Sequence, residues 1–262
     1  PPIDVRAVAL DGDLAYIAGE CLTGCPDRLW IYDLTDVLAP QLLGSVATTG
    51  LPSDIAVDGD VVYVADSDAG LSIIDATDPA APTVLAEIGG AGGQEAAVLG
   101  CVVLLLSANA LQAIDVTVPG APVLLDSVVG GGTGMAVSAG FAYTIPEFGI
   151  VDVSNPSDLQ VVPESWDGEF LPADAGQARI HEATLYVTAS HPYEGTEFQY
   201  YNTLSTYSLV GGTDPVLLDR IQRTGDDPVQ PRFCLADDVL YRAWDTRVID
   251  VAQPSRLTDT VG

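Results

Sequence analysis

An all-β fold is predicted by three observations on the 262 residues. A strand–turn–strand segment recurs six times along the chain. Each copy is followed by a second signature, in which an apolar run ends in Asp, or in Ser in the fifth copy, and Pro follows in most copies. Apolar residues nowhere recur with helical spacing. Four short strands in each unit of about forty residues are typical of a β-propeller. We therefore expect a six-bladed β-propeller with four antiparallel strands per blade.

The first signature aligns Val8–Ala18 with Ile55–Asp66 almost residue for residue. A large anchor side chain marks the second strand of each copy, at Tyr16, Tyr63, Leu104, Tyr143, Tyr186 and Tyr241. The copies cover the whole chain, so we expect a single domain over 1–262. Its blades are expected at about 1–50, 51–93, 94–134, 135–175, 176–228 and 229–262.

Turn residues separate the expected strands. Asp11-Gly-Asp13 and Asp58-Gly-Asp60 are typical of a type I′ hairpin turn between the first two strands. The Asp that ends the third strand is expected to accept hydrogen bonds from nearby amides. It recurs as Asp33, Asp75, Asp115, Asp152 and Asp250, with Ser208 in the fifth copy. Pro four residues after that Asp is expected in a turn, since Pro cannot donate to a central ladder.

The repeats resemble the LVIVD-repeat family. The resemblance is best carried by Val62–Asp66 and by Gly70-Leu-Ser-Ile-Ile-Asp-Ala-Thr-Asp-Pro79, and it is stronger in the first three copies than in the last three. It implies a bacterial or archaeal secreted or cell-surface propeller, which usually has no known catalytic residues. It supplies no site residue that could be carried over to this chain.

The charge limits the classes of partner. Nine Lys and Arg oppose 37 Asp and Glu, which gives a formal net charge of −28. Nucleic acid and anionic lipid surfaces would be repelled, so neither is expected as a partner. No apolar run is long enough for direct membrane insertion. The hydrophobic content of 48% excludes an acidic disordered tail.

Two of the four cysteines lie close together in a Gly- and Pro-rich loop, at Cys21 and Cys25. We expect a small-loop disulfide, with a reduced pair as the alternative. A disulfide favours an oxidising compartment, so the expected location is extracellular, at the cell surface or periplasmic. Cys101 and Cys234 fall in apolar runs and are expected to be small core residues.

The first strand of each blade is expected to line a central channel. Its polar positions give a set of channel residues at Asp54, Glu95, Gln177, Arg179 and Arg232. Arg179 stands where five other copies have a small residue, and a crowded guanidinium needs a partner. It either binds an anion or forms a structural ion pair with Asp54, Glu95 or Asp174.

A partner-binding surface is expected on the face that holds the blade connections and the loops between second and third strands. The loop from Ala189 to Asn202 in the fifth copy is much longer than its counterpart in the second copy. Aromatic side chains mark recognition surfaces, although they could instead cover the blade edge. The candidate residues are His191, Tyr193, Phe198, Tyr200 and Tyr201, with Trp244 and Arg247 from the sixth copy.

No catalytic motif occurs, so we expect no enzyme, no catalytic residue and no cofactor. Ca²⁺ at Asp66-Ser-Asp68 is the weaker reading, because no dedicated Ca²⁺-loop pattern is present. The preferred function is a non-catalytic extracytoplasmic module that binds a protein or a glycan through one loop face. One alternative is a metal-dependent, lactonase-like hydrolase at the channel mouth. The other is a structural module of a larger surface assembly.

Overall fold

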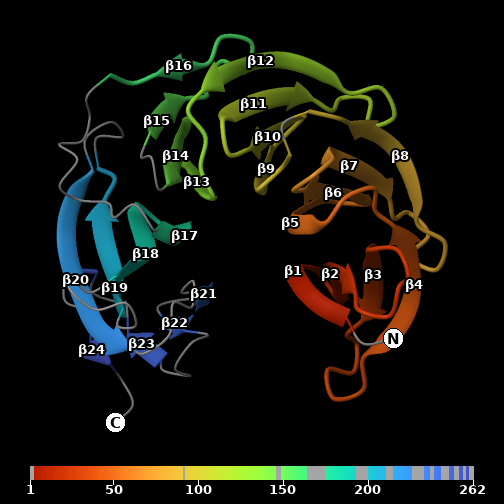
Figure 1. Cartoon of the computed structure of the whole chain (residues 1–262), viewed down its shortest axis with the longest axis horizontal. Helices are drawn as coiled ribbons and strands as arrows, with labels where there is room; N and C mark the ends of the chain where they lie inside the picture. Colours follow the sequence, from red (N-terminus) through yellow and green to blue (C-terminus); the bar gives the residue numbers. More distant parts are fainter. Residues whose placement is uncertain are drawn as a thin grey trace. The chain divides into compact units, whose positions relative to one another are not determined.

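A computed structural model describes eleven stretches of the chain: residues 3–90, 92–145, 149–163, 175–192, 200–210, 215–225, 233–236, 239–242, 248–250, 254–255 and 258–259. Within them every regular element is a strand, so the all-β prediction is confirmed (Figure 1). The strands pair in order of sequence into four-stranded antiparallel sheets. No described helix has the length and apolarity that a membrane crossing requires.

Contacts between residues divide the chain into two compact units. The first covers Pro1–Gly131 with Pro156–Asp158, and the second covers Gly132–Asn155 with Leu159–Gly262. Each unit holds three of the sheets described below. The prediction of a single domain over 1–262 stays a prediction.

The first unit contains the sheets of the first three repeats. Their inner strands lie side by side in sequence order, since β1 contacts β5 and β5 contacts β9. The strands are β1 (Ile3–Asp11), β2 (Leu14–Cys21), β3 (Arg28–Asp33), β4 (Gln41–Ala47), β5 (Pro52–Asp58), β6 (Val61–Asp66), β7 (Gly70–Asp75), β8 (Thr83–Ile88), β9 (Glu95–Leu99), β10 (Val102–Leu106), β11 (Ala110–Asp115) and β12 (Val123–Val129).

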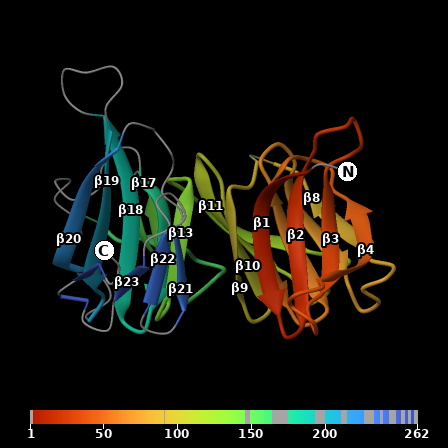
Figure 2. The same cartoon turned by 90° about the horizontal axis from the view of Figure 1, so that it is seen from below.

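The second unit contains the sheets of the last three repeats (Figure 2). Here too the inner strands are neighbours, with β13 against β17 and β17 against β21. The strands are β13 (Gly134–Ser138), β14 (Phe141–Ile145), β15 (Gly149–Asp152), β16 (Gln160–Val161), β17 (Ala175–His181), β18 (Thr184–Pro192), β19 (Tyr200–Ser208), β20 (Val216–Gly225), β21 (Phe233–Ala236), β22 (Val239–Arg242), β23 (Val248–Asp250) and β24 (Thr258–Asp259).

The hydrophobic core lies between neighbouring sheets. Alternation along the strands gives the sheets apolar faces, and within each unit the described clusters lie between the first and second, the second and third, and the fourth and fifth sheets. In the first unit, Tyr63 and Ile73 pack with Val103 and Ile114. The predicted anchors are almost fully buried, which confirms their role as core residues, at Tyr16, Tyr63, Leu104, Tyr143 and Tyr186. The side chain of Tyr241 lies outside the described residues.

The first five hairpin turns between first and second strands contain two residues, as expected, but four of them are not type I′. Gly12, Gly59 and Gly100 have positive φ angles of 55°, 56° and 60°, while the residue after each has none. That φ pattern belongs to type II′, in which only the first central residue is left-handed. Ala139 and Gly140 both have positive φ, as type I′ requires. The prediction of type I′ for the Asp-Gly turns was therefore wrong.

Four of the Asp residues that end a third strand accept a hydrogen bond from the amide two residues on, as predicted, and the side chain of Asp250 lies outside the described residues. The N···O distances are 2.7 Å at Asp33, 2.8 Å at Asp75 and Asp115, and 2.9 Å at Asp152. Ser208 makes the same contact with the Val210 amide at 3.3 Å. Hydrogen bonds from Thr77, through its hydroxyl and its amide, lower the pKa of Asp75. These side chains hold the start of the turn to the outer strand.

Replacing Asp75 by alanine is expected to lower the melting temperature by a few degrees, because the Thr77 amide and hydroxyl lose their acceptor. Asp75→Asn keeps an acceptor oxygen, so its melting temperature is expected to lie close to that of the wild type. The Asp75 pKa is lowered on folding, so the stabilisation is present above its unfolded pKa and lost as the pH falls below it. Differential scanning calorimetry at pH 7 and pH 3 measures this. An equal effect of Ala and Asn at pH 7 would contradict the assignment.

A β-bulge recurs where the third strand meets the outermost strand. In four sheets the register skips one residue of the outer strand, and that residue is always leucine: Leu43, Leu85, Leu125 and Leu218. A bulge increases the local twist of a strand and bends it. Since the skipped residue is the same in each, the bulge is part of the repeat rather than a local defect.

Candidate functional site

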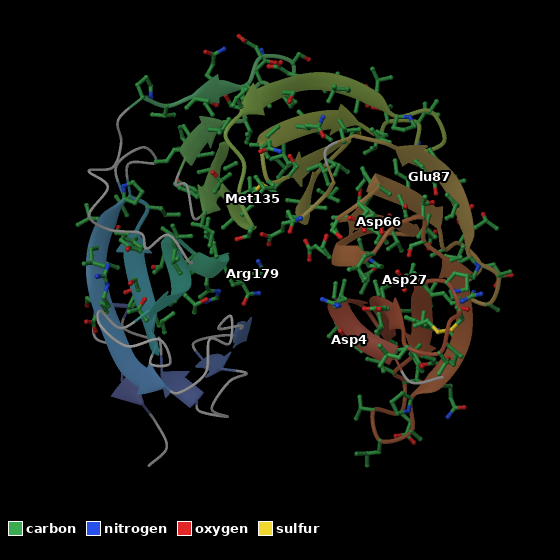
Figure 3. All side chains as sticks on the ribbon, viewed as in Figure 1. Asp4, Asp27, Asp66, Glu87, Met135 and Arg179 are labelled. Carbon is green, nitrogen blue, oxygen red and sulfur yellow. A yellow bond between two sulfur atoms is a disulfide. The ribbon has the colours of Figure 1, made fainter. Side chains whose placement is uncertain are left out.

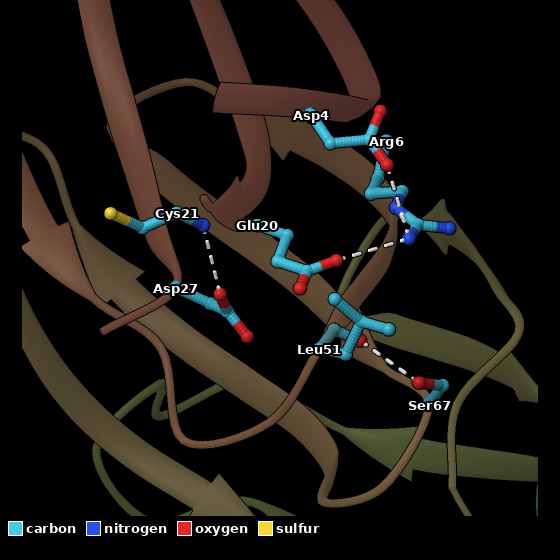
Figure 4. A network of polar contacts seen from close by, with 7 residues as sticks. All are labelled: Asp4, Arg6, Glu20, Cys21, Asp27, Leu51 and Ser67. Atoms are coloured by element: carbon cyan, nitrogen blue, oxygen red, sulfur yellow. Dashed lines mark hydrogen bonds and ion pairs between the residues drawn. The ribbon is translucent and has the colours of Figure 1, made fainter. Parts of the chain in front are cut away.

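The loops of the first unit form a linked network at the sheet ends that hold the blade connections (Figure 4). The Asp27 carboxylate accepts a hydrogen bond from the Cys21 amide at 3.1 Å, and its carbonyl accepts one from the Thr48 amide at 2.9 Å. The Leu51 carbonyl accepts hydrogen bonds from the amide and hydroxyl of Ser67 at 2.9 Å and 3.1 Å. These contacts join the β2–β3 loop, the β4–β5 connection and the β6–β7 turn.

Cys21 and Cys25 form a disulfide, which confirms the predicted pairing. It closes the β2–β3 loop beside Asp27. Cys101 was expected to be a core residue, but it is exposed. It occupies the second position of the β9–β10 turn, where the side chain leaves the packed face of the sheet. That prediction was therefore wrong, and the side chain of Cys234 lies outside the described residues.

Four of the predicted channel residues, Asp54, Glu95, Gln177 and Arg179, lie on inner strands, two in each unit. Asp54 is on β5 and Glu95 begins β9, and these strands are neighbours. The Asp54 carboxylate accepts a hydrogen bond from the Ala96 amide at 3.0 Å, and so links the second and third sheets. Glu95 is 9% exposed. The sequence prediction that these two acids come from adjacent blades fits this arrangement.

Gln177 and Arg179 lie on β17 in the second unit, and both are partly buried. The Arg179 guanidinium donates a hydrogen bond to the Ala178 carbonyl at 2.8 Å. Arg232 lies outside the described residues. Whether Arg179 binds an anion or forms a structural ion pair stays a prediction.

Arg6 is a cation on the first inner strand that sequence reasoning did not single out. It is the skipped residue of a bulge in β1, and Ser53 of β5 is the equivalent residue. Its guanidinium lies 3.1 Å from the Asp4 carboxylate and 3.3 Å from that of Glu20 (Figure 4). About 40% of each side chain, or more, is exposed, so the ion pairs contribute little to stability.

The expected loop of the fifth repeat is largely a hairpin. Ala189 to Asn202 was read as a loop, but β18 runs to Pro192 and β19 begins at Tyr200. His191 pairs with Tyr201, and Pro192 pairs with Tyr200. The prediction that His191, Tyr200 and Tyr201 lie in a loop was therefore wrong. Tyr193, Phe198, Trp244 and Arg247 lie outside the described residues.

This hairpin extends beyond its counterpart in the second repeat. β18 and β19 have nine residues each, whereas β6 and β7 have six. Three further residues per strand add about 10 Å at the usual rise of a strand. β20 pairs with β19 as far as Tyr200, so the extension is three-stranded. We call this segment, residues 190–192, 200–202 and 223–225, the fifth-repeat extension.

Sequence reasoning missed the burial of Asp66. It ends β6, its side chain is fully buried, and Oδ2 accepts a hydrogen bond from the Ser72 hydroxyl at 2.6 Å. Oδ1 is buried and has no hydrogen-bond partner among the described residues. Burial raises the pKa of Asp66 to about 6, against the lowering effect of Ser72. The nearby carboxylates of Glu87 and Asp27, labelled in Figure 3, add to the increase, as does that of Asp68.

The described residues contain no group of three or more acidic, His or Cys side chains that could hold a metal ion. Whether Ca²⁺ binds at Asp66-Ser-Asp68 stays a prediction. The absence of a cofactor stays a prediction.

The family model for the LVIVD repeat matches residues 49–88 and 130–164, which correspond to the second and fourth repeats. The resemblance to LVIVD repeats is thus confirmed. A search of curated proteins gave no match to the chain.

Several solved structures share the fold. A functionally unknown protein from Desulfotomaculum acetoxidans is 12% identical, with 98% of this chain and 89% of that chain covered and a TM-score of 0.69. The N-terminal domain of Nup159 is 12% identical over 98% of this chain and 73% of that chain, with a TM-score of 0.59. BamB from Moraxella catarrhalis is 14% identical, with 97% of this chain and 79% of that chain covered and a TM-score of 0.54. At these identities the similarity shows a propeller-like fold alone.

Proposed function

The chain carries LVIVD repeats, and we propose that it is a six-bladed β-propeller that binds a protein or a glycan through one loop face. Six four-stranded sheets among the described residues support the blade number, as does the contact of successive inner strands within each unit. Propeller-like neighbours support the architecture. An experimental structure with five or seven sheets around an axis would contradict it.

The fifth-repeat extension carries the functional part of the proposal. It breaks the repeat pattern at a place where the second repeat has a three-residue turn, 67–69. His191, Tyr200 and Tyr201 belong to it, and Tyr193 and Phe198 follow in sequence between β18 and β19. Tyr offers a large contact area at a low entropic cost, and aromatic residues are enriched at binding hot spots. Pairing with β20 on one side and β18 on the other supports a rigid carrier.

The disulfide supports an extracytoplasmic location, and the charge limits the classes of partner. Disulfides persist in oxidising compartments, and a formal charge of −28 disfavours nucleic acid and anionic lipid. A lactonase-like site is less well supported, because one acid it would use, Asp54, already accepts the Ala96 amide. Metal analysis with a screen of lactone and ester substrates tests that alternative. Bound metal at a stoichiometric level together with turnover would reverse the preference.

The proposal is tested by replacing Tyr193, Tyr200 and Tyr201 together by threonine, which keeps the strand propensity of the fifth-repeat extension. The immobilised protein is incubated with an extracytoplasmic extract of its source and, separately, with a glycan array. Loss of three aromatic contacts is expected to reduce capture at least about tenfold. The melting temperature is expected to stay within about two degrees of the wild type, as for surface substitutions.

The matched control replaces Leu38 and Val118 by threonine. Both side chains are exposed, by 92% and 59%, and both lie in turns between third and fourth strands, at the opposite end of their own sheets. This variant is expected to bind as the wild type does. Full binding by the triple Tyr variant, or equal loss in the control, would refute the assignment of the binding face.

A further inference from the structure

The carboxylate of Asp66 lies where three loops of the first unit meet. Its carbonyl accepts hydrogen bonds from Ala69 in the β6–β7 turn, at 3.2 Å, and from Gly93 in the β8–β9 connection, at 2.7 Å. The β4–β5 connection reaches the same place, since a Cβ on Gly50 would lie 3.2 Å from the Asp66 Cβ. We call these segments, residues 49–51, 66–69 and 92–93, the three-loop junction.

The three-loop junction is packed backbone against backbone. Gly92 has a φ of +42°, and a Cβ there would collide with the Ser67 carbonyl oxygen. The Ser53 hydroxyl lies 2.6 Å from the Gly93 carbonyl and 2.9 Å from that of Ala65. The exposed fraction of the Asp66 side chain in this packed arrangement is 0%, so bulk water does not solvate it. A charge on Asp66 must therefore be held with few compensating contacts.

Asp66 has one good hydrogen bond and a surplus of negative charge around it. Ser72 Oγ donates to Oδ2, and Oδ1 is unpaired among the described residues. The charged groups that act on the carboxylate are Glu87 from β8, Asp27 from the loop before β3, and Asp68 from its own turn. All three are acidic. The hydroxyl of Thr49, in the β4–β5 connection, donates a hydrogen bond to the Glu87 carboxylate. This contact holds the Glu87 carboxylate near the three-loop junction.

In the third repeat, an uncharged side chain makes the hydrogen bonds of the equivalent turn. Ser107 is the equivalent of Asp66, and its hydroxyl oxygen accepts the amides of Asn109 and Ala110 at 3.3 Å and 3.0 Å. Its hydroxyl also lies 3.1 Å from the Ala110 carbonyl. A neutral hydroxyl therefore closes the turn of the third repeat, whereas the second repeat buries an acid there. The acid is not needed to form the turn.

We propose that Asp66 makes the three-loop junction a proton-dependent element, which is tightly closed when the carboxyl group is neutral and opens more readily when it is ionised. A proton taken from solvent removes the buried charge and the repulsion from Glu87, Asp27 and Asp68. The loops that Asp66 joins are then held by their backbone hydrogen bonds without an opposing electrostatic cost. The proposal concerns the junction alone and does not depend on the proposed binding partner.

The direction of the pH effect on opening follows from the pKa of Asp66, which is raised to about 6 in the closed state. In an opened junction the side chain is solvated and its pKa returns toward about 3.9, the value of an unperturbed Asp. The closed state therefore binds the proton more tightly, and opening becomes easier as the pH rises. With these two values, the opening constant is expected to fall roughly tenfold between pH 7.5 and pH 5.

Amide hydrogen exchange of the full chain tests the proposal. Protection factors, corrected for the intrinsic pH dependence of exchange, are compared at pH 5 and pH 7.5 for peptides covering residues 49–53, 66–72 and 89–95. The wild type is expected to gain roughly tenfold protection at pH 5. Asp66→Asn is expected to show the same protection at both values. The peptide covering residues 105–112, around Ser107, is the internal control and is expected to change in neither protein.

Wild-type protection that is independent of pH would overturn the proposal, and this measurement needs no variant. An equal pH response in wild type and Asp66→Asn would also overturn it, because another group would then be responsible. Should Asp66→Asn not fold, Asp66→Ser, which copies the third repeat, takes its place. A pH response that persists in Asp66→Ser would overturn the proposal in the same way.

Discussion

Replacing Tyr63 by alanine is expected to lower the free energy of unfolding by about 3–5 kcal/mol. Tyr63 is 3% exposed and belongs to the cluster that joins the second and third sheets of the first unit. Removal of the ring leaves a cavity between Ile73 of its own sheet and the facing side chains of the third sheet. Because two sheets share this core, the loss affects both. Urea unfolding followed by tryptophan fluorescence measures it.

Val84→Ala is the matched control for Tyr63. Val84 lies on β8, the outer strand of the same sheet, and is 38% exposed. Its truncation is expected to cost about 0.5 kcal/mol or less. If Tyr63→Ala cost no more than Val84→Ala, the anchor position would not be the core residue that the repeat pattern predicts.

Asp66→Asn is expected to change the pH dependence of global stability. An acid whose pKa is higher in the folded chain binds its proton more tightly there, so wild-type stability falls as the pH rises from about 4 to about 6. Well above pH 6 the carboxyl group is ionised in the folded chain too, and the free-energy cost of its burial no longer increases. Relative to the wild type, the variant is expected to gain about 2–3 kcal/mol between pH 4 and pH 8.

The comparison of two pH values separates this electrostatic effect from any packing change in Asp66→Asn. A change in packing or in hydrogen bonds of the neutral side chain shifts the stability equally at both pH values, and it therefore cancels. Urea unfolding of both proteins at pH 4, 6 and 8 gives the difference. Parallel pH profiles would show that ionisation of Asp66 costs the folded protein nothing.

The sequence predicted those parts of the fold that repeat and depend on local geometry. Anchor positions such as Tyr63 and Tyr143 are almost fully buried, as their spacing indicated. Asp75 and its equivalents hold their turns through side-chain hydrogen bonds, because the acceptor and the amide are only two residues apart. The Asp contact lies within one turn, and the anchors recur at the same place in each copy, so the repeat pattern was enough to predict both features.

Features that depend on several distant segments were missed. The sequence analysis considered the Asp66 carboxylate only for Ca²⁺, and its burial comes from the β4–β5 and β8–β9 connections. The sequence signal that could have revealed the burial of Asp66 was Ser107, a small neutral residue at the equivalent position of the third repeat. His191 and Tyr200 were assigned to a loop because the segment is much longer than its counterpart in the second repeat, but β20 is long enough to extend the sheet there. Cys101 was misplaced because an apolar run hid a two-residue turn.

The leucine bulge of the outer strands has a consequence for association between molecules. The outermost strand of each sheet has one edge without a neighbour, and such edges can recruit strands of other chains into fibrils. Related repeats would raise that hazard, since every copy offers a similar template. The extra residue at Leu43, Leu85, Leu125 and Leu218 interrupts the regular row of amides and carbonyls and twists the edge. In these four sheets the bulge thus disfavours pairing of the outer strand with a strand of another molecule.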